Sequence, residues 1–317
     1  MRALLCPVSL KGVLSARAAA AALAHGVRET GGDAVELPVA DGGEGTADVL
    51  AAALGGEWHD ALVSDPFGRP VRARWLRLGD GRAVVDAAAA IGLPLLDPHE
   101  LDPLRASSRG LGELLVAIAA ARPSSVLVGL GGVATVDGGE GLREVVDELP
   151  FPTEALCDVR TLLRDAARLY GPQKGASPED VELLGRRLAA MPELTPYAEL
   201  AGAGAAGGLG AALAALGASL VPGAERILDL LGFGERVAGC DLVVSGEGEV
   251  DETTSEGKGP GEVARRSAEA GIRCVVFGGR VLTEVPGAET VALSGDPTRA
   301  EADLVDLGRR LTNESAL

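Results

Sequence analysis

Hydrophobic and polar positions at the start of the chain follow strand-like and helix-like patterns in turn. Two short apolar runs, at residues 2–8 and 33–40, predict buried strands. The alanine-rich segment between them, closed by Gly31 and Gly32, predicts a helix, and residues 41–54 read as a Gly-rich turn that leads into a second helix. This strand–helix–strand–helix order is typical of a parallel sheet.

The middle of the chain has a different pattern. Residues 57–88 alternate apolar and polar positions around the turn sequences DPFGRP and GDG, which predicts antiparallel strands. The strand–helix alternation returns in the last third of the chain. A parallel sheet begun by residues 1–55 and completed by about 220–317 would make the antiparallel part an insertion. Further elements expected along the chain are helices near 110–121, 177–191 and from 261, a loop that leads into a helix at 201–218, and strands at 124–130, 240–248, 274–279 and 290–294.

Composition narrows the class of protein. The 317 residues are 47% hydrophobic, enough for a sizeable core, and only 3% aromatic. The net charge of −17 argues against a nucleic-acid partner. The four cysteines form no CxxC pair, the N-terminus lacks the apolar length of a signal peptide, and no apolar run suits a membrane span. We therefore expect a cytoplasmic protein with reduced thiols and no membrane partner.

The lysines are unusually placed. Of 29 basic residues only three are lysine (Lys11, Lys174 and Lys258), and each is followed by glycine. Lysine is a compact point charge with rotatable donors, and a neighbouring glycine allows close approach of the backbone to a ligand. This pattern predicts three contacts with oxyanions, although surface loops would also produce it.

Four glycine-rich turns, three of which contain acidic residues, follow strand-like segments or enter helices. Such turns present backbone N–H groups to phosphate, and their acids could hold Mg²⁺ or act as a base. The combination predicts a phosphate-handling site. None of the turns matches a Walker P-loop, the GxGxxG at residues 202–207 is weak evidence for a dinucleotide, and the histidines fit neither a hydrolase triad nor zinc spacing. The turns are residues 40–46, 131–141, 201–210 and 245–251.

These motifs resemble those of the bacterial glycerate kinases, in the same order along nearly the whole chain. The family segment PVADGGEGT stands unchanged, PDSFKGSLSA resembles PVSLKGVLSA, and TGEGRIDxQTxxGK resembles SGEGEVDETTSEGK. The resemblance implies an α/β fold in two domains, a Rossmann- or flavodoxin-like parallel-sheet domain and an inserted mixed α/β domain. We expect the first at residues 1–56 and 216–317 and the second at 57–215. The shared segments are residues 7–16, 38–46, 65–70, 108–115, 129–141, 170–176, 202–208 and 245–258.

The resemblance also implies an activity: phosphorylation of D-glycerate by ATP with Mg²⁺, giving 2-phosphoglycerate rather than 3-phosphoglycerate. It leaves a homodimer open. Transferred by motif, the expected catalytic residues are Asp41, Lys11 and Asp251, and the expected metal ligands are Asp137 and Asp251. The expected substrate-binding residues are Lys174, Asp158, Gly42 and Gly43, and the expected nucleotide-binding residues are Gly131, Gly132, Glu247 and Lys258.

Several motif positions depart from the family pattern. Val8 stands for Asp, Val133 for Ser, Val136 for Asn and Glu249 for Arg, and the segment between Gly141 and Cys157 is short. Valine can neither take a proton nor bind a metal, so each change would remove a function wherever the position faces a ligand. Two alternatives therefore stay open: a catalytically weakened homologue that binds nucleotide or metabolite, and a kinase for another small hydroxy acid.

Overall fold

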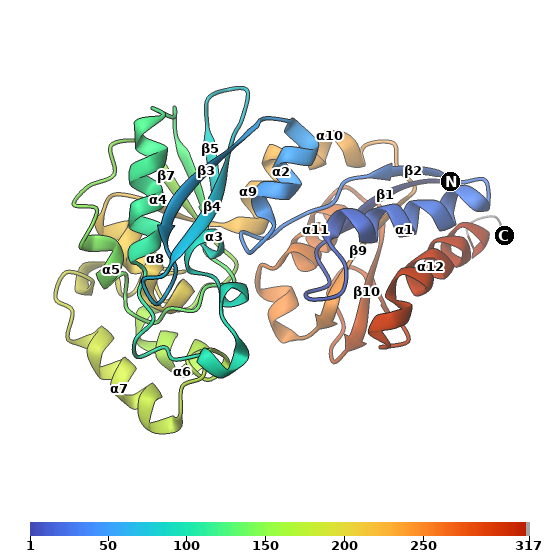
Figure 1. Cartoon of the computed structure of the whole chain (residues 1–317). Helices are drawn as coiled ribbons and strands as arrows, with labels where there is room; N and C mark the ends of the chain where they lie inside the picture. Colours follow the sequence, from blue (N-terminus) through green and yellow to red (C-terminus); the bar gives the residue numbers. More distant parts are fainter. Residues whose placement is uncertain (315–317) are drawn as a thin grey trace. The chain divides into compact units, whose positions relative to one another are not determined.

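The structure, a computed structural model, describes residues 1–314, and only the backbone at residue 256. The chain divides into two compact units (Figure 1): unit 1 is Met1–Asp41 with Ala224–Leu317, and unit 2 is Gly42–Gly223. The helix that follows Gly42 belongs to unit 2 because the carboxylate of Asp86 accepts hydrogen bonds from the backbone N–H groups of Gly45 and Ala47. The domain boundaries expected at 56/57 and 215/216 remain a prediction.

Unit 1 is built on a fully parallel sheet of order β11-β10-β9-β1-β2. With the strands counted as they occur in this sheet, the order is 2-1-3-4-5, which is the flavodoxin-like arrangement. The expected fold class is therefore confirmed for this unit. The strands are β1 (Arg2–Pro7), β2 (Asp33–Glu36), β9 (Leu242–Val250), β10 (Arg273–Val281) and β11 (Glu289–Ala292).

Helices cover this sheet. Helix α1 packs closely against α12. This close approach requires glycine at position 26, since a Cβ atom there would lie 2.0 Å from the carbonyl oxygen of Val305. Leucine and alanine side chains of both helices share a buried cluster with strand residues such as Leu5 and Phe277. Helix α11 contacts β9, β10 and β1. The helices are α1 (Ala16–Glu29), α9 (Gly223–Leu230), α10 (Phe233–Val237), α11 (Gly259–Glu269) and α12 (Ala300–Glu314).

Unit 2 contains a mixed six-stranded sheet of order β3-β4-β5-β6-β7-β8. The pairs β3–β4 and β4–β5 are antiparallel, as the alternating pattern predicts, and the remaining pairs are parallel. The mixed α/β character expected for the middle of the chain is confirmed. The strands are β3 (Glu57–Ser64), β4 (Pro70–Arg77), β5 (Ala83–Asp86), β6 (Val126–Gly129), β7 (Thr153–Cys157) and β8 (Ser219–Pro222).

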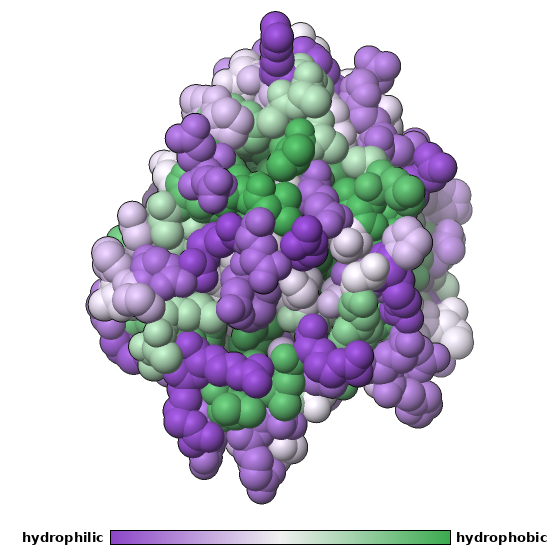
Figure 2. Space-filling view, turned by 60° about the vertical axis from the view of Figure 1, so that its left-hand side comes forward, coloured by the Kyte–Doolittle hydropathy of each residue, from purple (hydrophilic) through white to green (hydrophobic). Residues whose placement is uncertain are grey.

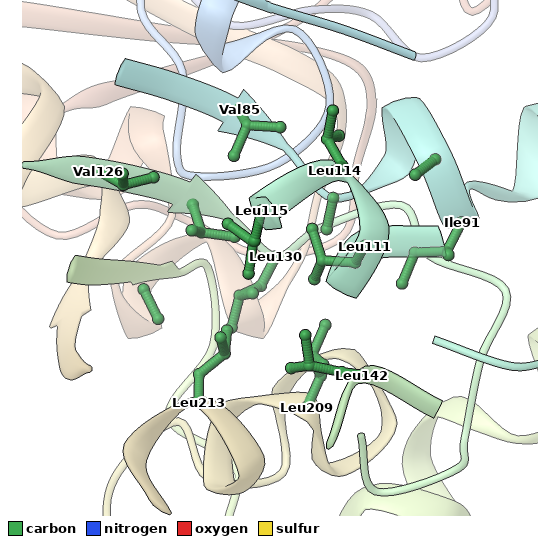
Figure 3. Close-up of a cluster of buried hydrophobic side chains, with 14 of the residues drawn as sticks. Val85, Ile91, Leu111, Leu114, Leu115, Val126, Leu130, Leu142, Leu209 and Leu213 are labelled. Carbon is green, nitrogen blue, oxygen red and sulfur yellow. The ribbon is translucent and has the colours of Figure 1, made fainter. Parts of the chain in front are cut away.

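The core of unit 2 forms where helices meet the sheet. Leu111, Leu114 and Leu115 of α4 pack with Val85 and Val126 of the strands, and leucines of α5 and α8 join them (Figure 3). Leucine, valine and alanine make up most of this core, as the scarcity of aromatic residues predicts. The helices are α2 (Thr46–Leu54), α3 (Ala88–Ile91), α4 (Arg109–Ala120), α5 (Glu140–Arg143), α6 (Ala166–Tyr170), α7 (Pro178–Ala189) and α8 (Ala205–Ala215).

The surface offers no extended apolar region on the face shown in Figure 2, where hydrophobic residues form small groups separated by hydrophilic ones. Among residues 1–314, no helix combines the length and the apolar character needed to cross a membrane. Two short strands (β7 and β8) and the C-terminal helix α12 were not among the elements expected from the sequence.

Candidate functional site

The carboxyl ends of the strands in unit 1 carry most of the expected charged residues. In sheets of this order the neighbouring loops diverge between the first and third strands, here β1 and β9, and ligands bind at that switch point. Lys11 follows β1 and is exposed, while Glu247 lies in the last part of β9 and Asp251 directly after it. The fold therefore brings a cation and two carboxylates to the end of the sheet where ligands are expected.

Lys258 joins these carboxylates. Its Nζ lies 4.0 Å from an oxygen of Glu247 and 3.6 Å from one of Asp251. The side chain of Lys258 is 24% exposed and that of Glu247 13% exposed. The hydroxyl of Thr254 donates to Glu247 at 2.7 Å, so the short helical turn Glu252–Glu256 folds back onto β9. We call Glu247, Asp251, Thr254 and Lys258 the Lys258 cluster.

The two acids of this cluster have opposite pKa shifts. Burial raises the pKa of Glu247 above its usual value, although the charge of Lys258 and the hydrogen bond from Thr254 oppose the shift. Partial burial would also raise the pKa of Asp251, but the hydrogen bond from Thr253 and the charge of Lys258 outweigh it and hold that pKa low. The charge of Asp41 contributes to the raised pKa of Glu247, so Asp41 faces the same group.

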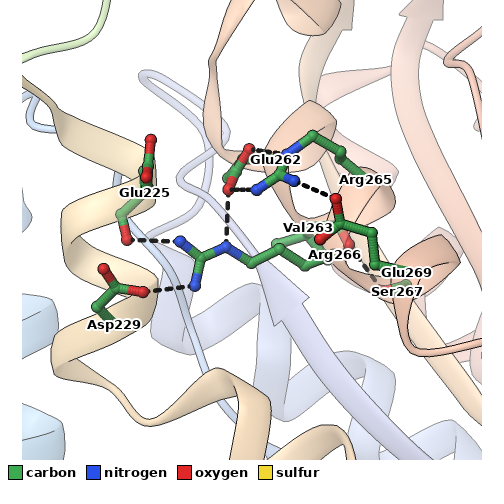
Figure 4. A network of polar contacts seen from close by, with 8 residues as sticks. All are labelled: Glu225, Asp229, Glu262, Val263, Arg265, Arg266, Ser267 and Glu269. Atoms are coloured by element: carbon green, nitrogen blue, oxygen red, sulfur yellow. Dashed lines mark hydrogen bonds and ion pairs between the residues drawn. The ribbon is translucent and has the colours of Figure 1, made fainter.

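Helix α11 begins at the Lys258 cluster, because Lys258 is its N-cap residue. A network of ion pairs ties this helix to α9 (Figure 4). Arg266 donates to Glu262 at 2.7 Å and to Asp229 at 2.6 Å, and Arg265 also donates to Glu262. Glu262 is buried and its pKa is low, because hydrogen bonds from both arginines overcome the opposing effect of burial. The network thus holds the helix end that carries Lys258.

The glycines expected at the site gather in unit 2. The N–H of Gly131 donates to the carbonyl of Gly42, and a Cβ at Gly131 would lie 2.5 Å from the Cα of Gly43 and 3.2 Å from an oxygen of Asp158. Gly132 has φ +79°, which favours glycine. A side chain would clash at Gly131 and would be strained by the backbone conformation at Gly132, so the chain needs glycine where the turns meet. We call residues 42, 43, 131, 132 and 158 the glycine cradle.

Asp86 also belongs to this region, although the sequence analysis did not single it out. Its buried carboxylate accepts from the N–H groups of Gly45 at 2.9 Å and Ala47 at 3.2 Å. Burial raises the pKa of Asp86 to about 7, although both hydrogen bonds favour the charged form. The sequence signal that could have identified Asp86 is an acidic residue at the end of a short apolar run, in AVVDA.

Lys174 lies in a different environment. It is 3% exposed, and its Nζ donates to the carbonyl of Thr135 at 2.7 Å. Burial lowers the pKa of Lys174 to about 7, against the charges of Asp137 and Asp158. We call Lys174, Thr135 and Asp137 the Lys174 cluster, which lies inside unit 2.

The carboxylate of Asp137 already has partners on both oxygens. Oδ2 accepts from the N–H and the hydroxyl of Ser108 and from the N–H of Gly141, and Oδ1 accepts from the N–H of Gly139. The side chain therefore fixes the 131–141 turn against the start of α4. Among the described residues, no group of three histidines, cysteines, aspartates or glutamates is arranged to hold a metal ion.

The GAGAAGG segment serves packing within unit 2. Ala206, Gly207 and Gly208 have positive φ, and a Cβ at Gly207 would lie 2.3 Å from the carbonyl oxygen of Thr135. The loop thus turns left-handed just inside α8 and packs on the 131–141 turn. This geometry explains the glycines of the GxGxxG match without a dinucleotide.

The valines at positions 8, 133 and 136, where the family pattern has polar residues, are buried. A Cβ at Gly259 would lie 2.4 Å from a methyl group of Val8, so Val8 packs on the start of α11. Val133 belongs to the main core of unit 2, and Val136 lies in a second cluster with Leu163 and Leu188. These three side chains make packing contacts at positions where the family pattern has polar residues.

Comparison with known proteins now decides the family. A model of the "Glycerate kinase family" matches residues 3–149 and 150–295. The chain belongs to this family. The glycerate 2-kinase of Escherichia coli strain K12 is 37% identical over 309 residues, which is 83% of this chain and 81% of that protein. The glycerate kinase of Bacillus subtilis strain 168 is 33% identical over 326 residues, which is 89% of this chain and 85% of that protein.

A solved structure shares the fold. The crystal structure of a protein assigned as glycerate kinase 2 from Salmonella typhimurium LT2 matches with a TM-score of 0.81 at 31% identity, covering 100% of this chain and 98% of that chain. The resemblance noted from the sequence is confirmed, and so is the mixed α/β fold with mainly parallel sheets. Curated members of the family are named as kinases, a class of phosphotransferases.

Proposed function

We propose that this protein transfers the γ-phosphoryl group of ATP to a hydroxyl of D-glycerate, with 2-phosphoglycerate as the product. The observation that carries the proposal is the Lys258 cluster, in which a partly exposed cation lies between two carboxylates at the carboxyl end of β9. Phosphoryl transfer requires cations on the moving group and carboxylates for a metal or a proton. Family membership supports glycerate as the acceptor.

The residues of unit 1 would divide the chemistry among them. Asp41 would accept the proton of the glycerate hydroxyl while its oxygen bonds to the γ-phosphorus, and the bond to the β–γ bridging oxygen would break to release ADP. Lys11 and Lys258 would neutralise the charge on the transferring group. Lys11 is exposed and a Cβ at Gly12 would meet no atom within 4 Å, and the side chain of Lys258 is 24% exposed.

Mg²⁺ suits the Lys258 cluster better than the Lys174 cluster. Magnesium in such enzymes is usually held by one or two carboxylates together with substrate phosphates and water. Glu247 and Asp251 would hold it, and it would neutralise charge on the phosphates. Asp137 accepts four hydrogen bonds from the protein, so we assign it instead to fixing its turn.

The glycine cradle of unit 2 would bind an anionic substrate. Its glycines allow the turns at residues 42–43 and 131–132 to meet without side chains, and Asp158 offers an acceptor for a hydroxyl group. Gly131 and Gly132, expected on the nucleotide side, lie with Gly42 and Gly43 in this cradle. We therefore assign all four glycines to one anion site, and Glu247 and Lys258 to the nucleotide.

The test is direct. Purified protein, ATP and Mg²⁺ are mixed with D-glycerate, and ADP release is followed while phosphorus NMR identifies the modified hydroxyl. We expect turnover of roughly 1–100 per second. L-glycerate, tartronate and glycolate serve as alternative acceptors. Absence of ADP release with every acceptor, from folded protein that ATP still stabilises, would contradict the proposal and favour a binding function.

A further inference from the structure

Strands β9 and β10 extend beyond their neighbours at the carboxyl edge of the unit 1 sheet. The last residue of β9 that pairs with β1 is Gly246, and the last residue of β10 that pairs with β11 is Gly278. The pairing of β9 with β10 continues to Val250 and Val281. The two strands therefore form a short ribbon at the end of the sheet where the Lys258 cluster lies.

Glu249 and Arg280 face each other across this ribbon. They are partners in the strand register, and Nη1 of Arg280 lies 2.9 Å from a carboxylate oxygen of Glu249. Both are accessible, with Arg280 69% and Glu249 43% exposed. An ion pair this exposed contributes little to stability, because water screens the charges and both side chains lose freedom. Stability alone therefore gives a weak reason for the pair.

The face of the ribbon points to a ligand role. Side chains two residues apart along a strand lie on the same face, so Glu249 shares a face with Glu247, and Arg280 shares it through the register. Glu247 is a member of the Lys258 cluster. The face thus carries a second cation beside that cluster, on a strand 22 residues further along the chain than Lys258.

The same pair contains the charge reversal noted in the sequence. The family pattern has arginine at position 249, where this chain has glutamate. Because residue 280 pairs with residue 249, an arginine at 280 keeps a guanidinium on the same face of the ribbon, and Glu249 restrains it. The ribbon therefore presents a guanidinium on this face although position 249 is glutamate.

We propose that Arg280 binds the phosphate groups of the nucleotide, held in place by Glu249. This inference rests on the proposed function for its ligand. A planar guanidinium can bind phosphate oxygens through two parallel hydrogen bonds. Arg280 is exposed and pairs with one carboxylate, so it keeps N–H donors for such a contact. Glu249 is then a positioning residue that orients the arginine.

A matched control lies on the same strand. Arg273 begins β10 and pairs with Glu289 on β11, so it is also an arginine in a cross-strand ion pair, at the opposite end of the sheet. The experiment compares Arg280→Gln with Arg273→Gln in the full-length protein. It measures the Kd for ATP by calorimetry, the KM for ATP, kcat and Tm.

We expect Arg280→Gln to weaken ATP binding and raise the KM for ATP by roughly 10- to 100-fold, the effect of losing charge-assisted hydrogen bonds. Its Tm should stay within about 2 °C of the wild type, as expected for an exposed pair. Arg273→Gln should leave the Kd unchanged. Arg280→Glu should weaken ATP binding more than Arg280→Gln does. Adding Glu249→Arg to the Arg280→Glu variant should recover ATP binding.

Equal Kd values for the wild type and Arg280→Gln would overturn the inference, as would a wild type that binds no ATP. The inference would also be overturned if Arg280→Glu lowered Tm and the double variant recovered Tm but not ATP binding. That result is expected only if the ion pair serves the fold and does not touch the nucleotide. Calorimetry separates this inference from the proposed function: ATP binding that depends on Arg280, without turnover of glycerate, would refute the function and support the nucleotide contact.

Discussion

The Lys174 cluster and the Lys258 cluster look alike in the sequence but differ in the structure. Each combines a lysine followed by glycine with an acid from a glycine-rich turn. Lys258 is partly exposed between two carboxylates, whereas Lys174 is enclosed and donates to the carbonyl of Thr135. Asp251 likewise lies near the surface, whereas Asp137 accepts four hydrogen bonds from the protein.

This difference separates two uses of the same motif. A group whose hydrogen-bonding capacity is filled by the protein holds the fold, while one that is partly exposed and loosely paired can meet a ligand. We therefore expect Lys258 to contact the transferring phosphoryl group. We expect Lys174 to stabilise the 131–141 turn through its hydrogen bond to Thr135. The substrate-binding role expected for Lys174 from the family remains the competing prediction.

The largest effect should come from Lys258→Met. Removing a cation from the transferring phosphoryl group should lower kcat by roughly 10²–10³-fold, because positioned charges dominate this chemistry. Tm should change little, because Nζ of Lys258 lies 3.6 Å from Asp251 and 4.0 Å from Glu247, longer than a hydrogen bond to either carboxylate. Steady-state kinetics and a thermal melt check both parts. An unchanged kcat together with a much lower Tm would mean that Lys258, like Lys174, stabilises the fold. Lys258→Arg tests whether a positive charge at this position is enough for activity.

Val136→Asn tests the surroundings of the Lys174 cluster. Val136 is 1% exposed in an apolar cluster, so an amide there would lose packing and bury polar atoms. We expect the free energy of unfolding to fall by about 2–4 kcal/mol, without any gain in activity. Chemical denaturation measures the change. Val116→Asn, at an exposed valine of α4, is the control and should be nearly neutral. A gain in activity would instead mean that position 136 faces the substrate.

Lys174→Met should act on stability. The change leaves the buried carbonyl of Thr135 without its donor and Asp137 without a nearby cation, so the free energy of unfolding should fall by about 1–3 kcal/mol. Below the melting transition, the KM for glycerate should stay within about threefold of the wild type. Arg186→Met removes an exposed cation and serves as the control. A large rise in this KM with an unchanged Tm would restore the substrate role.

The smallest effect, taken over a single pH unit, concerns the buried Asp86. Its pKa is raised to about 7, so between pH 4 and 7 the native protein holds a proton that the unfolded chain has lost. The free energy of unfolding then falls as pH rises through this window, by up to about 1.4 kcal/mol per pH unit. In Asp86→Asn this contribution should vanish and the curve should flatten. Asp60→Asn, at an exposed position, should follow the wild-type curve.

Much of the candidate site could be predicted because its members are neighbours in the sequence or sit in family motifs. Glu247, Asp251 and Lys258 lie within one short segment, and the structure brings them together as a cluster. Asp86 and Arg280 were missed. Asp86 was missed because it stands alone after a buried strand and belongs to no motif. Arg280 was missed because its pairing with Glu249 depends on the strand register, which the sequence does not reveal.

The sequence by itself determined many of the local elements, although not β7, β8 or α12, since the spacing of apolar residues favours helices and strands, and its motifs determined the family. It also determined where glycine was required, at turns such as 131–132. The tertiary structure alone decided that β7 and β8 complete the second sheet and that Arg280 faces Glu249. It alone decided that Lys174 is buried and Lys258 is not. The physical reason is that solvent exposure, and the pKa that follows from it, depends on segments far away in the chain packing over a residue.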